Sequence, residues 1–222
     1  ALVGLQNIKG EFEKLAAFIK VEQKRKELGG ERSLLNNHFV FMGNPGTGKT
    51  TVARLLGKVF KTLGVLKKGH VIEVDRSNLV AKFIGQTSAK TNEAIDTAMG
   101  GILFIDEAYS LVVEDSKNDF GQQAIQTLLK RMEDDAERFI VIVAGYPSEM
   151  DKFINSNPGL SSRFKRQILF EDYSAEELFE IFILMLEKKN LEMTDEAVLK
   201  AKSIFVEIYS SRDKNFGNGR TV

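Results

Sequence analysis

The 222-residue chain carries 31 Lys and Arg residues against 31 Asp and Glu residues, so its formal net charge is zero. This balance argues against nucleic acid or an acidic membrane surface as the main partner, because the chain as a whole attracts neither. The chain has no cysteine, which excludes a disulfide framework and a thiolate metal site, and we expect a cytoplasmic protein. No apolar run is long enough to span a bilayer.

The first expected elements are a helix, a strand and a second helix. Apolar residues recur at spacings of three and four over residues 5–19, which predicts an amphipathic helix that ends near Gly29. The apolar run at 38–42 predicts a strand. Apolar residues from Val52 to Leu63 return to helical spacing, so a helix follows the glycine-rich segment between them.

That glycine-rich segment, GNPGTGKT at 43–50, fits the phosphate-loop pattern G-x-x-x-x-G-K-[ST]. A loop around a polyphosphate must aim its backbone N–H groups inward, and glycine leaves room for this approach. We expect the N–H groups of residues 46–51 and the Lys49 side chain to bind the phosphates of ATP, and the Thr50 hydroxyl to bind Mg²⁺. The residues expected to contact ATP here are Asn44, Pro45, Gly46, Thr47, Gly48, Lys49, Thr50 and Thr51.

After the second helix, the sequence predicts a strand at 70–74, a short helical turn, and a helix that is capped by Thr87 or Ser88. An aromatic residue, Phe83, lies in the polar connection before this helix. From its residue type alone, Phe83 is best explained as an anchor that holds the connection against the core.

Two carboxylates follow the next apolar run. The run at 102–105 is bounded by glycines and predicts a buried parallel strand, and Asp106 and Glu107 come directly after it. Carboxylates beside a core are costly unless a cation or a substrate uses them. Downstream of a phosphate loop, we expect Asp106 to hold the Mg²⁺ shell and Glu107 to orient or deprotonate the water that attacks the γ-phosphate.

A further buried strand is expected at 139–145, with Tyr146 at its exit, where a side chain can reach the attacking water. Ser148 is expected to cap a short helix. Residues 157–166 are expected to form a loop that leads into a strand at 167–170.

Only helices are expected in the last part of the chain. Ser174 and Glu177 have the capping-box spacing, and Thr194 is placed to cap another helix. The fold class is therefore α/β, with a parallel-sheet nucleotide domain at 1–172 and an all-helical appendage at 173–222.

Six segments in this order resemble the AAA+ ATPases, and more closely the group that contains stage V sporulation protein K and the red-type rubisco activases. They are GNPGTGKTTVARLLGK, GHVIEVDRSNLV, GGILFIDEAYSL, VIVAGYPSEM, NPGLSSRF and FGNGRTV. The resemblance implies a P-loop ATPase with a helical lid that assembles as a homo-hexamer and remodels a protein client. Because the chain stops soon after Arg220, we expect a truncated lid and a piece of a longer protein.

The resemblance also implies roles around the nucleotide. Val3 and Gly4 match the segment that lies beside the adenine, and Arg220 matches the sensor arginine of the lid. Many family members carry an Asn near the end of the strand where this chain has Tyr146, so the match of Tyr146 to a water-sensing residue is only positional.

Other matches concern neighbouring subunits and the client. Phe83, Ile84 and Gly85 match the pore loop, which grips a peptide in the centre of a ring. Arg163 matches the arginine finger, which reaches the γ-phosphate bound by the neighbouring subunit, and Arg166 is a second candidate.

The favoured function is ATP hydrolysis that drives remodelling of a protein. An ATP-switched assembly module with incidental hydrolysis is an alternative from another class. A nucleic-acid motor fits the neutral charge and the aromatic Phe83 less well. A small-molecule kinase also uses a phosphate loop, but Glu107 beside Asp106 fits hydrolysis better.

Overall fold

A parallel five-stranded sheet lies at the centre of the computed structural model, which describes residues 3–29, 38–83, 85–112, 120–213 and 216–222. The strand order is β2-β3-β4-β1-β5, and all four neighbouring pairs are parallel. The strands are β1 (Phe39–Gly43), β2 (Val71–Val74), β3 (Ile102–Ile105), β4 (Ile140–Gly145) and β5 (Arg166–Phe170).

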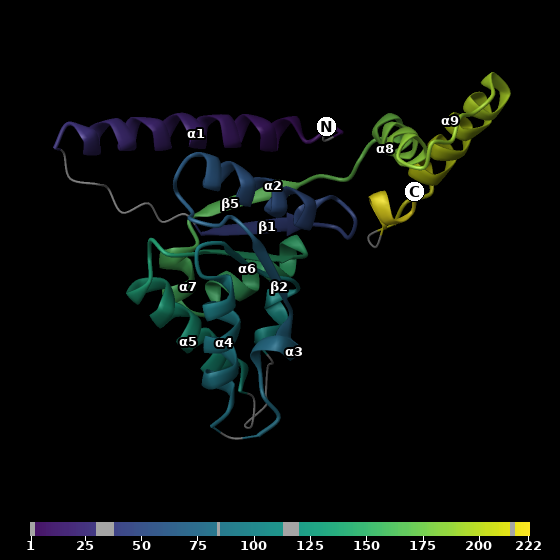
Figure 1. Ribbon diagram of the computed structural model, residues 1–222. Helices are drawn as coiled ribbons and strands as arrows, with labels where there is room; N and C mark the ends of the chain where they lie inside the picture. The colour runs from purple at the N-terminus through teal and green to yellow at the C-terminus, as the bar shows by residue number, and fades with distance from the viewer. Residues whose placement is uncertain (1–2, 30–37, 84, 113–119, 214–215) are drawn as a thin grey trace.

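Helices cover both faces of this sheet (Figure 1). The helices are α1 (Gln6–Glu27), α2 (Lys49–Thr62), α3 (Arg76–Leu79), α4 (Thr87–Ala98), α5 (Gly121–Asp134), α6 (Pro147–Asn155), α7 (Pro158–Arg163), α8 (Ala175–Glu187) and α9 (Asp195–Ser210), with short 3-10 helices η1 (Ala108–Leu111) and η2 (Asn218–Arg220). Helices α1 and α2 lie on one face, and α4, α5, α6 and α7 lie on the other. None of the helices in the described ranges is long and apolar enough to cross a membrane.

Two apolar cores form because successive strand residues point to opposite faces. On β1, Phe39 and Phe41 pack with α1 and α2, while Val40 packs with the helices of the other face. The rings of Phe41 and Phe170 lie 4.9 Å apart, which joins β1 to its neighbour β5. Strands β1, β3 and β4 are buried along nearly their whole length, as expected for a parallel sheet covered on both sides.

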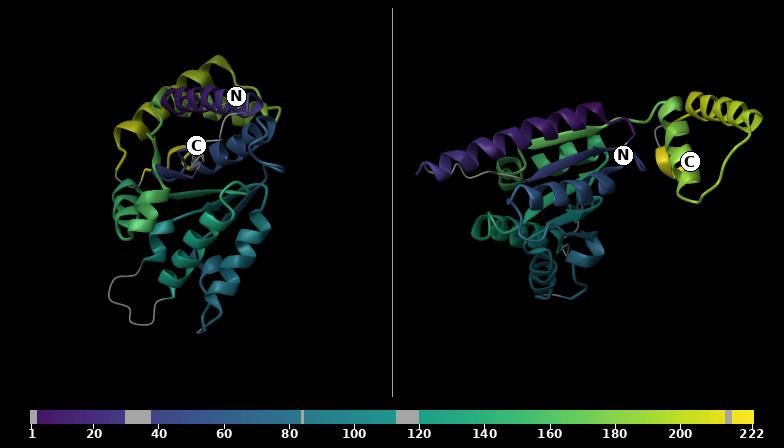
Figure 2. Two further views of the ribbon diagram at one scale, coloured as in Figure 1. Left: turned by 90° about the vertical axis from the view of Figure 1, so that its left-hand side faces the viewer. Right: turned by 45° about the horizontal axis from the view of Figure 1, so that its top comes forward.

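The final helices form a separate small unit beyond one end of the sheet (Figure 2). Phe205 of α9 packs against Phe179 and Phe182 of α8, with ring centroids 6.3 and 5.5 Å apart. The capping box of Ser174 and Glu177 is confirmed, because each side chain accepts a hydrogen bond from the other residue's backbone N–H. We call this unit, from residue 174 to 222, the lid.

Three local predictions are wrong. Thr87 is the first residue of α4 rather than its cap, and its hydroxyl accepts a hydrogen bond from the N–H of Ala81. Ser148 lies inside α6, because Pro147 occupies the first helical position and the cap is Tyr146, two residues before Ser148. Residues 158–163 of the predicted loop form α7, which begins after the side chain of Asn157 caps the N–H of Gly159.

The sheet topology brings three chain segments together where the strands end, which we call the carboxyl edge of the sheet. Because β3, β4 and β1 are adjacent and parallel, their carboxyl ends lie side by side. The phosphate loop follows β1, Asp106 and Glu107 follow β3, and Tyr146 follows β4. This edge is where open parallel sheets bind ligands.

Candidate functional site

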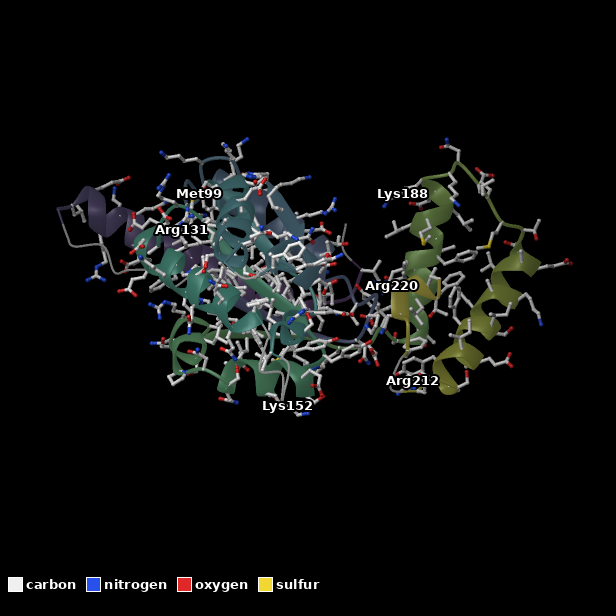
Figure 3. All side chains as sticks on the ribbon, turned by 90° about the horizontal axis from the view of Figure 1, so that it is seen from below. Met99, Arg131, Lys152, Lys188, Arg212 and Arg220 are labelled. Carbon is white, nitrogen blue, oxygen red and sulfur yellow. The ribbon has the colours of Figure 1, made fainter. Side chains whose placement is uncertain are left out.

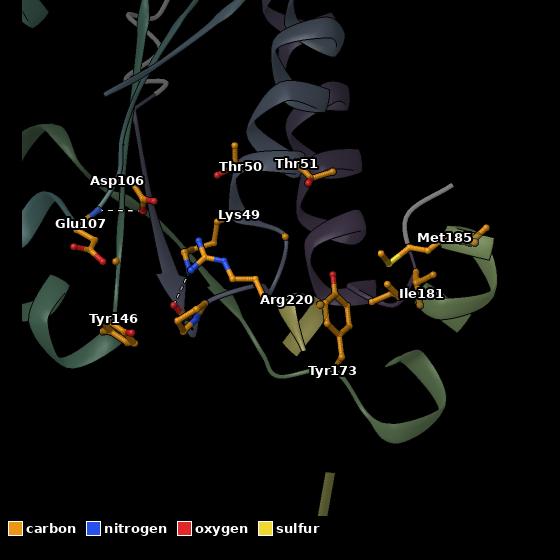
Figure 4. A pocket seen from close by; sticks show the side chains of 18 of the residues that line it. Lys49, Thr50, Thr51, Asp106, Glu107, Tyr146, Tyr173, Ile181, Met185 and Arg220 are labelled. Carbon is orange, nitrogen blue, oxygen red and sulfur yellow. Dashed lines mark hydrogen bonds between the residues drawn. The ribbon is translucent and has the colours of Figure 1, made fainter. Parts of the chain in front are cut away.

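A cavity of about 470 Å³ lies between this sheet edge and the lid. Figure 4 shows carboxylates toward one end, cationic side chains in the middle and apolar side chains toward the lid. The residues that line the cavity are Val3, Gly43, Pro45, Gly46, Gly48, Lys49, Thr50, Thr51, Asp106, Glu107, Gly145, Tyr146, Tyr173, Ile181, Leu184, Met185, Lys188, Gly219 and Arg220. The structure therefore brings together most of the residues that the sequence singled out.

The phosphate loop is shaped by two glycines in the left-handed region. Gly46 has φ 72° and Gly48 has φ 92°, which side chains rarely adopt. Gly48 also precedes α2, so the N-terminal end of that helix opens into the cavity. At Gly46 the missing Cβ leaves room for the lid as well, because a Cβ there would overlap the carbonyl of Gly217.

The Lys49 side chain is held inside the phosphate loop by backbone carbonyl groups of that loop. Its ammonium donates hydrogen bonds to the carbonyl oxygens of Gly43 and Asn44, at 2.7 and 2.8 Å. Burial lowers the pKa of Lys49; the nearby Asp106 opposes this and Arg220 adds to it. Two cationic side chains, Lys49 and Arg220, therefore share one cavity, which favours an anionic ligand.

The two carboxylates stand on the opposite side of the loop, at the end of β3. The Asp106 carboxylate accepts a hydrogen bond from the N–H of Glu107, at 3.1 Å. Glu107 has φ 47°, an uncommon conformation for a residue with a side chain. Its exposed side chain lines the same cavity as the loop and Arg220.

These residues fit a polyphosphate with Mg²⁺. Within the described ranges, no group of three or more His, Cys, Asp and Glu residues is arranged to hold a metal. Mg²⁺ characteristically uses one or two protein oxygens together with substrate phosphates and does not require such a group. Thr50 and Asp106 both line the cavity and supply such oxygens.

Tyr146 lines the cavity at the exit of β4, and its ring lies 6.3 Å from that of Tyr109. Burial, with a smaller contribution from Glu107, raises the pKa of Tyr109 to about 12. The Tyr109 phenol therefore stays protonated beside the carboxylates at neutral pH.

The apolar end of the cavity was missed by the sequence analysis, apart from Val3. It is formed by Tyr173, which immediately precedes the lid, and by Ile181, Leu184 and Met185 of α8. Lys188, the C-cap of α8, lines the cavity beside them. The sequence of α8 did contain a signal for this apolar wall. The helix is apolar on more than one face, and packing against α9 accounts for only one of these faces.

Three expected nucleotide contacts lie behind the cavity wall rather than on it. The Asn44 amide donates to the Asp172 carboxylate, and the buried Thr47 hydroxyl donates to the carbonyl of Asn44. Gly4, with φ 59°, lies against the carboxylate of Glu177 on α8.

The residues expected to act between subunits lie away from the cavity. Arg163 ends α7 and forms an ion pair with Glu133 of α5. Arg166 begins β5. Phe83 is 68% exposed in the connection between α3 and α4, with Gly85 beside it, whereas Ile84 lies outside the described residues.

Seen from below, the lid stands beside the sheet domain, and Arg220 lies on the side of the lid that faces it (Figure 3). The turn that carries Arg220 is anchored to the phosphate loop, because the N–H of Gly219 donates to the carbonyl of Gly46 at 3.1 Å. Arg220 therefore reaches the cavity from the lid, while Lys49 reaches it from the sheet domain.

Comparison with known proteins agrees with this geometry. Residues 39–172 match the family described as "ATPase family associated with various cellular activities (AAA)", and residues 174–222 match the AAA lid domain. Among solved structures, the AAA domain of FIGL-1 in complex with ADP has a similar fold, with a TM-score of 0.61 at 16% sequence identity. The match covers 94% of this chain and 70% of that one.

Curated relatives are much closer in sequence. Stage V sporulation protein K of Bacillus subtilis is 48% identical over all of this chain and 69% of the relative. The chloroplastic ribulose bisphosphate carboxylase/oxygenase activase of Cyanidioschyzon merolae is 43% identical over all of this chain and 75% of the relative. The ESX-3 secretion system protein EccA3 of Mycobacterium leprae is 43% identical, and this chain spans 36% of its length. The chain therefore belongs to the AAA family of ATPases, in the group that contains the sporulation and rubisco activase proteins.

Proposed function

We propose that the chain uses ATP hydrolysis, assisted by Mg²⁺, to remodel a protein client within a homo-hexameric ring. One observation carries the nucleotide part of this proposal. Lys49 of the phosphate loop shares one cavity with the lid cation Arg220 and with the carboxylates of Asp106 and Glu107. A polyphosphate with a divalent cation complements this arrangement of charges.

The proposed roles follow from position. Lys49 and the N–H groups at the start of α2 bind the phosphates, and Thr50 and Asp106 hold Mg²⁺, which supplies charge neutralisation at the phosphates when bound. Glu107 orients the attacking water and accepts its proton. The protonated Tyr109 beside it is not a competing base.

The apolar end of the cavity is proposed to hold the adenine. Val3, Ile181 and the flexible Met185 provide apolar contacts, and the Tyr173 hydroxyl reaches from this end to the carbonyl of Thr47 in the phosphate loop. This assignment makes the lid part of the nucleotide site, so that lid position and nucleotide state are linked.

The ring and the client are proposed from surface positions and from the relatives. Arg163 does not reach the cavity of its own chain, and its place on α7 allows it to serve a neighbouring subunit instead. The exposed Phe83 suits a peptide-gripping role better than a core anchor. The relatives carry names from sporulation, secretion and rubisco activation, so the client is left as a protein of unspecified identity.

Substitution of Glu107 tests the hydrolytic role. Glu107→Gln keeps the shape of the side chain but removes the base, so we expect nucleotide affinity close to wild type and an ATPase rate lower by about 10²-fold or more. Glu149→Gln is the matched control, because Glu149 pairs with Lys152 on the surface of α6. Wild-type turnover in Glu107→Gln would remove Glu107 from this role.

A further inference from the structure

Three consecutive carbonyl groups of the phosphate loop accept hydrogen bonds from the lid and from Tyr173, the residue immediately before it. Pro45 O accepts from the Asn218 side chain at 3.3 Å, Gly46 O from the N–H of Gly219 at 3.1 Å, and Thr47 O from the Tyr173 hydroxyl at 3.2 Å. We call these three bonds the carbonyl clasp.

The clasp has a physical reason. A loop that aims its N–H groups at phosphates turns the carbonyl groups of the same peptides outward, and each buried carbonyl needs a partner. Within the loop, Lys49 and Thr47 serve the carbonyl groups of residues 43 and 44, which leaves those of residues 45–47 to be served from elsewhere. In this chain the partners of residues 45–47 come from residues 173, 218 and 219, more than 120 positions away along the sequence.

Asn218 is the centre of this arrangement. Its side chain is fully buried, and its φ of 48° is a conformation that Asn tolerates better than most residues. Its amide oxygen accepts from the N–H of Tyr173 at 2.9 Å. Its amide nitrogen shares two hydrogens among three acceptors, namely Asp172 at 2.7 Å, the carbonyl of Phe216 at 3.1 Å and the carbonyl of Pro45 at 3.3 Å. One side chain thus joins the lid, the connection and the loop.

Asp172 extends the connection to the first part of the loop. Its carboxylate accepts from Asn218 and also from the Asn44 side chain, at 2.9 and 3.1 Å to its two oxygens. Backbone packing reinforces the contact, because a Cβ on Gly46 would overlap the lid residue Gly217. The missing side chain at Gly46 therefore allows the loop and the lid turn to approach closely.

We propose that Asn218 is a positioning residue for phosphate binding, which holds the phosphate loop in its anion-binding shape through the carbonyl clasp and Asp172. The inference rests on the proposed function, in that the loop binds nucleotide phosphates. It assigns to the lid a second action on the nucleotide besides direct contact by Arg220. Rotation of the lid away from the loop would release the carbonyl groups of residues 45–47 and loosen the grip on the phosphates.

The test compares ADP with adenosine, which share the base and ribose but differ in phosphates. Asn218→Gly removes the amide and is compatible with the positive φ, so the turn can keep its path. We expect the affinity for ADP to fall by about tenfold or more, because several buried hydrogen bonds are lost, while the affinity for adenosine changes less than about twofold. The affinity for ADP is measured by direct titration, and the affinity for adenosine is measured by its competition against a fluorescent ADP analogue.

Asn190→Gly is the matched control. Asn190 also lies in the lid with a positive φ of 54°, but it is exposed and follows the end of α8, away from the loop. We expect both affinities to stay at the wild-type values. An equal loss of ADP and adenosine affinity in Asn218→Gly would show that Asn218 only supports the lid. Unchanged ADP affinity would show that the carbonyl clasp does not contribute to phosphate binding. Either result overturns the inference.

Exchange of the amide and the carboxylate between Asn218 and Asp172 provides a second, independent test. Asn218→Asp places a carboxylate against Asp172 and should weaken ADP binding, whereas adding Asp172→Asn restores a donor and an acceptor across the pair and should recover part of the loss. No recovery in the double variant would contradict the proposed pairing. If wild-type protein itself does not bind ADP, the proposed function fails together with the inference, whereas a wild-type protein that binds ADP confines any failure to the clasp.

Discussion

At the scale of single residues, two residues of the site carry a cost in the folded chain, Glu107 through its backbone conformation and Lys49 through the burial of its charge. Glu107 holds a positive φ, and residues held in such conformations cluster at functional positions because the surrounding fold enforces them. Burial lowers the pKa of Lys49. Bound phosphate would reverse this effect, since an anion favours the charged ammonium.

His38 shows the opposite case, a titratable residue that the fold uses for structure. It is buried at the start of β1, and its Nδ1 accepts a hydrogen bond from the N–H of Val141 at 3.0 Å. Its ring packs near those of Phe139 and Phe164, with centroids 6.4 and 6.0 Å away. Burial, with a smaller contribution from Arg163, lowers the pKa of His38 from 6.5 to about 4.

This shift predicts a specific acid sensitivity. Between about pH 6.5 and 4 the unfolded chain binds a proton at His38 and the folded chain does not, so the free energy of unfolding falls as the pH falls through this window. His38→Asn keeps an acceptor for Val141 without the titration. We expect the wild type to lose about 2 kcal/mol more than this variant between pH 7 and pH 5 in urea unfolding. Parallel losses would contradict the assignment.

At the scale of elements, α8 serves two neighbours. One side packs against α9 through Phe182, and another lines the cavity through Ile181 and Met185. Its first turn sits directly after the connection between the sheet domain and the lid and is closed by the capping box of Ser174 and Glu177. The start of α8 therefore fixes where the cavity wall stands relative to the sheet.

Removal of this cap should weaken the lid. Ser174→Ala leaves the N–H of Glu177 without its partner, so we expect the free energy of unfolding to fall by about 1 kcal/mol in urea unfolding. Ser203→Ala is the control, because Ser203 is exposed within α9 and donates only to the carbonyl of Lys200. Its effect should stay within about 0.5 kcal/mol. Equal changes in the two variants would show that the cap does not limit stability.

The sequence predicted those elements whose cause is local. The strands of the sheet and the caps at Ser174 and Thr194 were confirmed, because apolar runs and cap spacing act over a few residues. Helix α7 was mistaken for a loop, since Asn157 followed by proline begins a short helix as readily as a turn. The phosphate loop and the acid pair were recognisable because each is contiguous in the sequence.

The rest of the site depends on contacts that are distant along the chain. The apolar wall from α8 could not be predicted, since it requires knowing how the lid docks on the sheet domain. The same holds for Asn218, whose partners are Pro45, Asp172 and Tyr173. Two of these four residues, Asp172 and Tyr173, belong to none of the quoted segments, and Asn218 lies in FGNGRTV without a role of its own there. Their roles appear only once the lid turn lies against the loop.

At the scale of the whole molecule, the proposed sharing of the site between subunits depends on the position of Arg163. Arg163 lies outside its own cavity and is paired with Glu133, an exposed contact that contributes little to stability. Breaking such an ion pair costs little free energy of folding, so Arg163 can leave Glu133 and serve a neighbouring subunit.

Complementation tests this sharing. Arg163→Ala and Glu107→Gln should each be nearly inactive alone, because one lacks the arginine given to a neighbour and the other lacks the base. In randomly mixed rings, an active site needs an Arg163→Ala subunit beside a Glu107→Gln subunit. We therefore expect an equimolar mixture to regain about a quarter of the wild-type ATPase rate. A mixture that stays inactive would contradict a shared site.

The central claim is that nucleotide phosphates bind in the loop around Lys49, and calorimetric titration with a non-hydrolysable ATP analogue and Mg²⁺ tests it most directly. Lys58→Ala, an exposed lysine on the same helix, is the matched control and should bind like the wild type. We expect Lys49→Ala to bind at least about tenfold more weakly, because a charge-assisted contact to the phosphates is lost. Equal affinity of Lys49→Ala and the wild type would contradict the account.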